Sequence, residues 1–196
     1  MKKLLFFLLI QLSLSEEIII NLITTNDIHG FIEPQKAYFM NPQYPPNIIG
    51  GSAFYEYVQN IKLESSKNNE GLLILDGGNF FQGTELGVFD KGMTMIEWMN
   101  YVGYDAIVPG QYDFIFGIDN LDLLTRKAKF DFLGANIECK ICLPEVKPYI
   151  IEEVEGINVG ILGIINSSIP DYISSSYLSE VTFHQKQLWK IKHGKC

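Results

Sequence analysis

Short apolar runs alternate with helical patterns along this chain, and this alternation constrains its fold more than any other feature. The apolar runs are Ile18 to Thr24, Leu72 to Leu75, Ala106 to Val108, Phe132 to Ala135, Tyr149 to Val154 and Asn158 to Ile164. Each run stops at a loop rich in Gly, Asn and Asp. Strands that are buried on both faces have nearly continuous apolar sequences, whereas strands of a sandwich alternate. The pattern therefore predicts an α/β fold in which helices cover a largely parallel sheet.

The segments between the apolar runs have helical spacing. A helix capped by Ser52 is predicted from apolar residues spaced three and four apart, and further helices are predicted over Thr94 to Tyr101 and Ile118 to Ala128. Gly103 and Gly117 act as helix breakers. The last two apolar runs flank a Glu155-Gly156 turn and form a predicted hairpin, while Asn41 to Pro46 is interpreted as a surface loop.

Length and charge bound the possible functions. A chain of 196 residues with 47% hydrophobic and 19% charged residues has enough apolar material for one packed domain. It contains 15 Lys and Arg against 23 Asp and Glu, which gives a net charge of −8. A basic surface that would neutralise a phosphate backbone is not expected, so nucleic acid is not expected as a partner.

The first fifteen residues have the pattern of a secretory signal peptide. Lys2 and Lys3 precede an apolar stretch from Leu4 to Leu14, and Ser13 and Ser15 supply small residues at positions −3 and −1 of a cleavage site. The alternative, a membrane anchor, is disfavoured because the stretch is shorter than the roughly 20 residues that span a bilayer. We expect cleavage after Ser15, secretion or residence in the secretory pathway, and a mature domain over residues 16–196 with no transmembrane helix.

The three cysteines leave two alternatives open. Cys139, Cys142 and Cys196 are an odd set that, in an oxidising compartment, allows one short-loop disulfide and one remaining thiol. Free thiols are the other reading. A lone Cys-x-x-Cys is only half of a zinc site, so metal binding at these cysteines is disfavoured.

Three loops that follow predicted strands carry candidate chemistry, because functional residues of open α/β sheets collect at the carboxyl ends of the strands. The loops are Thr24 to Gly30, Asp76 to Thr84 and Pro109 to Phe114. In the first, Asp27 and His29 stand two residues apart and could share one metal ion; the alternative is a loop-capping Asp beside an incidental His. The glycines of the second loop could cradle an anion or simply allow two backbones to approach closely.

Taken in order, these loops resemble the 5′-nucleotidase family of the metallophosphoesterases. The resemblance rests on Thr25 to Gly30 with Glu33-Pro34, Gly50 to Ala53, Leu73 to Asn79 with Phe81 to Thr84, Met99 to Ala106, Phe132 to Ile137 and Val159 to Ile164. It extends from about Ile18 to His184, in the order and spacing of the family, which is more specific than any single motif.

The resemblance implies a partial four-layer α-β-β-α metallophosphoesterase sandwich and a metal-dependent hydrolase that acts on nucleotides or other small phosphoesters. Two divalent cations, zinc, manganese or similar, would polarise the ester and generate the attacking hydroxide. Asp27 and His29 match ligands of the first metal. Asn79 stands where the family has a bridging carboxylate, Gln111 where it has an Asn ligand of the second metal, and Tyr112 where it has a catalytic His; the adjoining Asp113 stands at a family Glu.

The substituted positions predict impaired chemistry. The Asn79 amide offers one neutral oxygen where a carboxylate would compensate two cations. Gln111 moves its carbonyl outward by one methylene, and a phenol is a weaker acid at neutral pH than an imidazolium. The family takes further His ligands and a second domain from downstream segments, so the resemblance implies an incomplete domain. We expect at most one cation, and two hypotheses stay open: an impaired secreted 5′-nucleotidase, or an inactive pseudoenzyme or truncated remnant that acts as a binding module.

Overall fold

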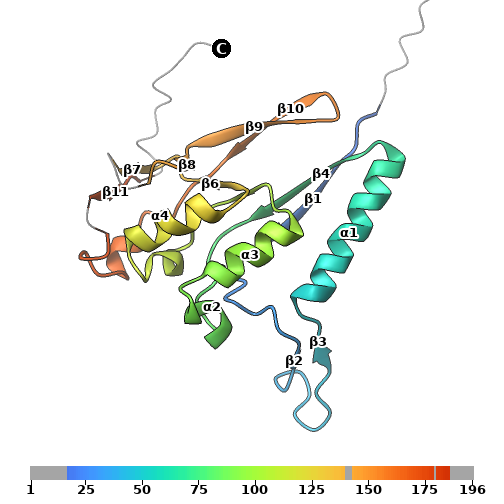
Figure 1. Ribbon diagram of the computed structural model, residues 1–196, viewed down its shortest axis with the longest axis horizontal. Coiled ribbons are helices and arrows are strands. Elements are labelled where there is room, and N and C mark those ends of the chain that lie inside the picture. Colours follow the sequence, from blue (N-terminus) through green and yellow to red (C-terminus); the bar gives the residue numbers. More distant parts are fainter. Residues whose placement is uncertain (1–16, 140–142, 179, 186–196) are drawn as a thin grey trace, which may run out of the picture.

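A parallel five-stranded sheet forms the centre of the molecule. The computed structural model describes residues 17–139, 143–178 and 180–185 (Figure 1). The sheet has the order β1-β4-β5-β6-β8, and every neighbouring pair is parallel. Its strands are β1 (Ile20–Thr25), β4 (Gly71–Asp76), β5 (Ala106–Ile107), β6 (Asp131–Leu133) and β8 (Val146–Lys147). The predicted α/β class with a parallel sheet is confirmed.

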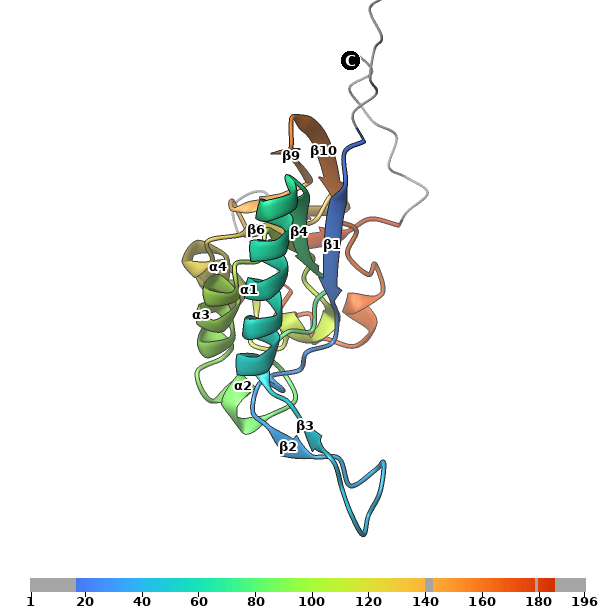
Figure 2. The same ribbon diagram turned by 90° about the vertical axis from the view of Figure 1, so that its right-hand side faces the viewer.

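Helices cover one face of this sheet. They are α1 (Gly51–Asn68), α3 (Met93–Val102) and α4 (Ile118–Lys127), and the short α2 (Glu85–Phe89) precedes α3 (Figures 1 and 2). Gly103 ends α3 in the left-handed conformation with φ 85°, and Gly117 is the N-cap of α4, so both predicted breakers are confirmed. The predicted Ser52 cap is wrong. The α1 helix begins two residues earlier than that cap implies, after Gly50, and no side chain caps it, because the close approach of Gly51 to Ile32 sets its start.

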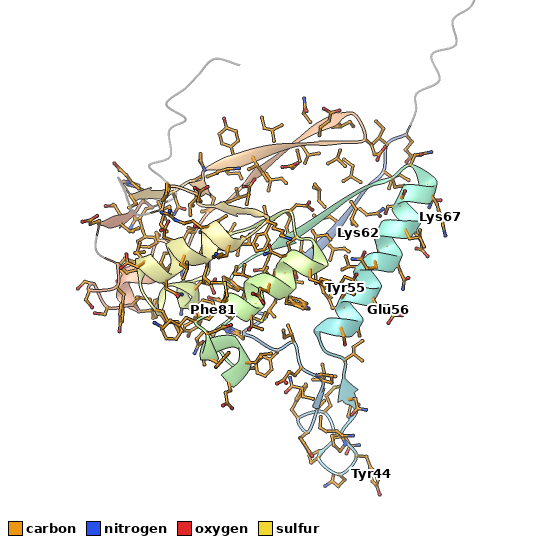
Figure 3. All side chains as sticks on the ribbon, in the orientation of Figure 1. Tyr44, Tyr55, Glu56, Lys62, Lys67 and Phe81 are labelled. Atoms are coloured by element: carbon orange, nitrogen blue, oxygen red, sulfur yellow. The ribbon has the colours of Figure 1, made fainter. Side chains whose placement is uncertain are left out.

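The core lies between the helices and the sheet, and aromatic rings anchor the loops at its lower end. Phe80 and Phe81 lie in the loop after β4 and are fully buried, with ring centroids 5.1 Å apart and an edge-on geometry. Phe81 is labelled in Figure 3. Phe114, two residues after Tyr112, is also fully buried. Each buried Phe contributes about 1.5–3 kcal/mol, so the loops after β4 and β5 are fixed by packing as well as by hydrogen bonds.

The other face of the sheet is covered in part by a hairpin. Strands β9 (Tyr149–Val154) and β10 (Ile157–Leu162) pair antiparallel around Glu155 and Gly156, whose φ values of 48° and 76° are those of a two-residue hairpin turn. The predicted hairpin is confirmed. A small cluster of Ala106, Leu133 and Ile150 is buried beneath it. An apolar groove of about 340 Å³ lies beside this cluster, and Leu22 on β1 is 59% exposed.

Two short strand pairs complete the described structure. They are β2 (Gln35–Lys36) with β3 (Asn47–Ile48), and β7 (Ile137–Cys139) with β11 (Val181–Phe183). The β2–β3 pair closes a loop that projects away from the sheet, which confirms the surface loop predicted around Asn41 to Pro46 (Figure 2). The remaining elements are the 3-10 helices η1 (Gln111–Phe114) and η2 (Ile169–Asp171).

The predictions for the signal peptide and for two of the three cysteines fall on residues that the structure does not describe. The predicted signal peptide lies outside the described residues, and so do Cys142 and Cys196. Cys139 is disulfide-bonded, so the free-thiol reading is wrong for this cysteine. Within the part of the chain that the structure describes, no helix is both long enough and apolar enough to cross a membrane.

Candidate active site

The loops after β1, β4 and β5 meet at the carboxyl end of the sheet, as the sequence predicts. The backbone of the first loop runs along the second: Asp27 N–H donates to the Gly78 carbonyl over 3.0 Å, and His29 N–H to the Asn79 carbonyl over 2.9 Å. The backbone N–H of Tyr112, in the third loop, donates to the Asn79 side chain. These contacts bring together four of the five predicted site residues: Asp27, His29, Asn79 and Tyr112.

Asp27 and His29 form a pair that suits a single cation. His29 Nε2 lies 3.7 Å from Asp27 Oδ1, and both side chains are partly exposed. His29 Nδ1 lies 2.5 Å from the carbonyl oxygen of Gln82. Because a carbonyl only accepts hydrogen bonds, Nδ1 is the donor to Gln82, and in the neutral ring the lone pair is then on Nε2. Two ligands that each bind a cation at about 2.0–2.2 Å fit this separation.

The Asn79 side chain is not oriented as a ligand that bridges two cations would be. Its Oδ1 accepts from the Tyr112 backbone N–H over 2.9 Å, and its Nδ2 donates to Asp27 Oδ1 over 2.7 Å. The amide therefore presents hydrogens, not an oxygen, to Asp27. Across residues 17–139, 143–178 and 180–185, no group of three or more His, Cys, Asp or Glu side chains could hold a metal ion. Asp27 and His29 thus stand together as two donors of the type that bind a cation, and the Asn79 amide turns its nitrogen, not its oxygen, toward Asp27.

Tyr112 and Gln111 flank the site from η1. The Tyr112 ring lies 5.8 Å from the His29 ring, centroid to centroid, and is 38% exposed. Its phenol is thus near the pair and accessible to a ligand. Gln111 begins η1 and is half-buried; it adjoins Tyr112 in sequence, and no described contact joins its amide to the other four residues.

Asp113 is the buried support of the site, a role that sequence reasoning did not assign. Its Oδ2 accepts from the backbone N–H groups of Asn79 (2.7 Å) and Gly110 (2.8 Å), and its Oδ1 from that of Phe80 (3.0 Å). Complete burial raises the pKa of Asp113 to about 7, against the lowering effect of these hydrogen bonds. One carboxylate therefore ties the loop after β4 to the loop after β5. The available signal was an acidic residue directly before a buried Phe.

Asp76 is a second supporting acid that the sequence pattern did not single out. At the end of β4, its Oδ2 accepts from the Thr25 hydroxyl over 2.6 Å and its Oδ1 from the Gly78 N–H over 2.8 Å. Burial raises its pKa to about 6. Thr25 also contacts the Tyr104 hydroxyl over 2.9 Å. Asp76 therefore joins the ends of β1 and β4 beneath the site.

The backbone at the site lies in an uncommon conformation. Asp27, His29 and Asn79 have φ values of 54°, 52° and 58°, in the left-handed region that side chains other than Asn and Asp seldom adopt. Such residues persist only where surrounding contacts hold them, and they concentrate at functional sites. The same three residues carry the candidate chemistry.

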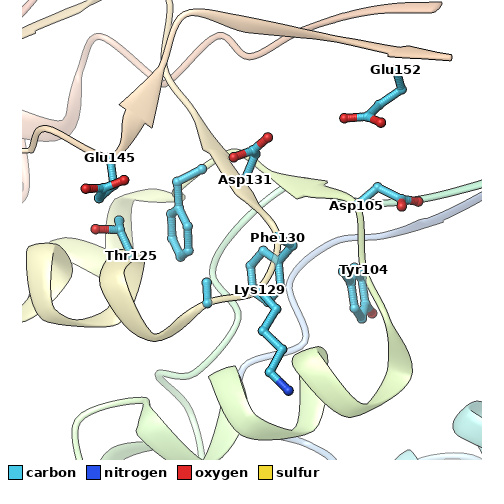
Figure 4. A pocket seen from close by; sticks show the side chains of 10 residues that line it. Tyr104, Asp105, Thr125, Lys129, Phe130, Asp131, Glu145 and Glu152 are labelled. Carbon is cyan, nitrogen blue, oxygen red and sulfur yellow. The ribbon is translucent and has the colours of Figure 1, made fainter.

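A separate polar hollow lies at the other end of the sheet, where the strands begin. It has a volume of about 430 Å³, and its lining includes Asp105, Asp131, Glu145 and Glu152 (Figure 4). Asp105 directly precedes β5 and Asp131 begins β6. Asp131 is paired with Lys147 over 2.6 Å. Because this hollow is at the amino ends of the strands, it is a poorer candidate than the three loops.

Comparison with known proteins identifies the class. No protein-family profile matches the chain. In structure, it superposes on a calcineurin-like phosphoesterase, YfkN of Bacillus subtilis, with a TM-score of 0.59 and 22% identity over 83% of this chain and 53% of that one. It superposes on a 5′-nucleotidase precursor of Thermus thermophilus with a TM-score of 0.71 and 23% identity over 84% of this chain and 32% of that one. The fold is that of the metallophosphoesterases.

Sequence comparison narrows the class further. The chain is 32% identical to 5′-nucleotidase of Rattus norvegicus over 180 residues, which are 86% of this chain and 30% of the relative. It is also 32% identical to snake venom 5′-nucleotidase of Gloydius brevicauda over 157 residues, 77% of this chain and 26% of the relative. The chain contains a partial domain of the 5′-nucleotidase type, and it spans less than a third of the length of these relatives.

Proposed function

We propose that this chain is a nucleotide-binding metallophosphoesterase domain of the 5′-nucleotidase type, with weak or no hydrolytic activity of its own. The substrate class follows from the relatives, which are named 5′-nucleotidases. The observation that carries the proposed impairment is the hydrogen bond from Asn79 Nδ2 to Asp27 Oδ1. At the position where the family resemblance implies a carboxylate between two cations, this chain has an amide donor.

The retained half of the site could hold one divalent cation. Asp27 and His29 would supply a carboxylate oxygen and the Nε2 lone pair, and Asn79 could assist only through its oxygen, which the Tyr112 N–H already engages. A bound zinc or manganese ion would supply Lewis-acid polarisation of a phosphate oxygen. Gln82 holds His29 in the required tautomer. The Tyr112 phenol can donate a hydrogen bond to a phosphate oxygen but is a poor general acid at neutral pH.

The second candidate function is a binding module without turnover. The same amide–carboxylate contact favours it, because loss of one electrostatic stabiliser already costs about 10²-fold or more in rate. The two candidates differ in a single observable: both predict that a nucleoside monophosphate binds at the site, and only the first allows weak phosphate release.

We propose in addition that the protein enters the secretory pathway and that cleavage after Ser15 yields a mature chain that begins at Glu16. The Ser13-x-Ser15 pattern after the apolar stretch supports this, and one relative is named for its occurrence in venom. N-terminal sequencing of secreted material should read Glu16 first; an intact Met1 on secreted protein would contradict the proposal.

Turnover of nucleoside monophosphates tests the proposed function. Phosphate release should be measured with Mn²⁺ or Zn²⁺ for the unmodified chain and for the triple variant Asn79→Asp, Gln111→Asn, Tyr112→His, which restores the residue types that the resemblance implies. Asn120→Asp, at an amide that bonds only the Lys91 carbonyl among the described contacts, is the matched control. We expect little or no release from the unmodified chain and from the control. Turnover by the unmodified chain at ordinary enzyme rates, about 1–10³ s⁻¹, would refute the impairment.

A further inference from the structure

The Asn79 side chain contacts two loops other than its own. Its Oδ1 faces the Tyr112 backbone N–H and its Nδ2 faces Asp27 Oδ1, at 2.9 and 2.7 Å. The orientation of the amide is fixed chemically, because a backbone N–H only donates and so must meet the oxygen. The NH₂ group is then directed at Asp27. One half-buried side chain thus joins the loops after β1, β4 and β5.

Asp27 receives an amide hydrogen on each of its oxygens. Asn26 Nδ2 donates to Oδ2 over 2.5 Å, and Asn79 Nδ2 donates to Oδ1. Hydrogen bonds from amides compensate a carboxylate charge directly. With a carboxylate in place of Asn79, an oxygen would stand at the position of Nδ2, 2.7 Å from Asp27 Oδ1. Two carboxylates at that distance repel and require a cation or a shared proton between them.

The backbone of Asn79 is held independently of its side chain. Its N–H donates to the buried Asp113 carboxylate over 2.7 Å, and its carbonyl accepts from the His29 N–H over 2.9 Å. Its φ of 58° is therefore imposed by neighbours on both sides. These backbone hydrogen bonds fix the position of Asn79, so its side-chain amide contacts Asp27 from a rigidly held backbone.

We propose that Asn79 is a cation-independent clasp, which holds the three loops together through hydrogen bonds at the place where a bridging cation would otherwise hold them. The inference depends on the proposed function only for the identity of the site, and it makes no claim about turnover. It implies that the loops adopt their observed arrangement with no divalent ion present. It also implies that exchange of this amide for a carboxylate makes the arrangement depend on a cation.

Thermal unfolding without substrate tests the clasp. The unmodified chain, Asn79→Asp and the control Asn120→Asp should be unfolded in EDTA and again in Mn²⁺. We expect Asn79→Asp to lower Tm by about 5 °C or more in EDTA and Mn²⁺ to restore much of that loss. The control loses only an exposed hydrogen bond to the Lys91 carbonyl, so its Tm should shift equally in EDTA and in Mn²⁺. The unmodified chain should stay folded in EDTA.

The double variant Asp27→Asn with Asn79→Asp exchanges the two side chains. It shows whether the Tm loss of Asn79→Asp comes from the broken clasp or from a general loss of packing. It rebuilds one amide and one carboxylate at the same contact, so its Tm in EDTA should recover toward that of the unmodified chain, even where Asn79→Asp alone fails to fold. An exchanged pair no more stable than Asn79→Asp would overturn the proposal, as would unfolding of the unmodified chain by EDTA. Phosphate release by the unmodified chain at ordinary enzyme rates, about 1–10³ s⁻¹, would refute the proposed impairment and leave these Tm results unaffected.

Discussion

The candidate site has two halves, one after β1 and one after β4 and β5. Their side chains differ in chemistry, but hydrogen bonds hold the backbone of both equally well. On the β1 side, Asp27 and His29 keep a carboxylate and an imidazole nitrogen at 3.7 Å, the residue types that bind a cation. On the β4 and β5 side, an amide, a longer amide and a phenol stand at Asn79, Gln111 and Tyr112. Backbone hydrogen bonds between 2.7 and 3.0 Å nevertheless fix both halves. The scaffold of such a site is thus separable from its ligand chemistry.

Removal of Asp113 should have the largest effect, because it breaks the backbone support of the site and leaves the candidate ligand side chains in place. Asp113→Ala leaves the N–H groups of Asn79, Phe80 and Gly110 without their buried acceptor. Each unsatisfied buried donor costs about 1–3 kcal/mol, so the free energy of unfolding should fall by more than about 3 kcal/mol. Urea denaturation measures this loss.

Glu56→Ala is the control for the loss of a carboxylate, since Glu56 lies exposed on α1 (Figure 3). It should change the free energy of unfolding by less than about 0.5 kcal/mol. Equal effects of the two substitutions would mean that Asp113 does not support the site, and the separation of scaffold from ligand chemistry would lose its main argument.

Asp76 should give a smaller, pH-dependent effect. Its pKa is raised from 3.8 to about 6 in the folded chain. Between these values the folded state holds a proton that the unfolded state has lost, so the contribution to stability is complete below pH 3.8 and is lost as pH rises through 6. The free energy of unfolding, relative to that of Asp76→Asn, should fall by about 2–3 kcal/mol between pH 4 and pH 7. A pH-independent difference in urea denaturation would show that Asp76 does not titrate in this range.

The sequence predicted the framework well because long-range order in this fold follows local patterns. The continuous apolar run Leu72 to Leu75 has the composition of a buried central strand, and Gly103 and Gly117 end and begin helices. The strand pairs β2–β3 and β7–β11 were missed, because two or three residues carry no periodicity. The start of α1 was misplaced by two residues because a close backbone approach, and not a side-chain cap, defines it.

For the candidate site, the sequence predicted which loops adjoin but not the contacts between their side chains. Asp27, His29, Asn79 and Tyr112 were placed correctly at adjoining loops, since the ends of parallel strands converge. That the Asn79 amide turns its nitrogen to Asp27 depends on the Tyr112 N–H, 33 positions away, and no local pattern encodes it. The buried roles of Asp76 and Asp113 depend in the same way on packing that forms only in the folded chain.

Cation stoichiometry tests most directly the claim that the two halves of the site are unequal. Mn²⁺ binding should be titrated calorimetrically on the unmodified chain, on His29→Ala and on His184→Ala, which removes a histidine that contacts Glu138 instead of the site. We expect at most one weakly held ion per chain, with an affinity unchanged in His184→Ala and weakened at least tenfold, about 1.4 kcal/mol, in His29→Ala. Two ions per unmodified chain would contradict it, because the Asn79 amide would then not prevent a bridged pair.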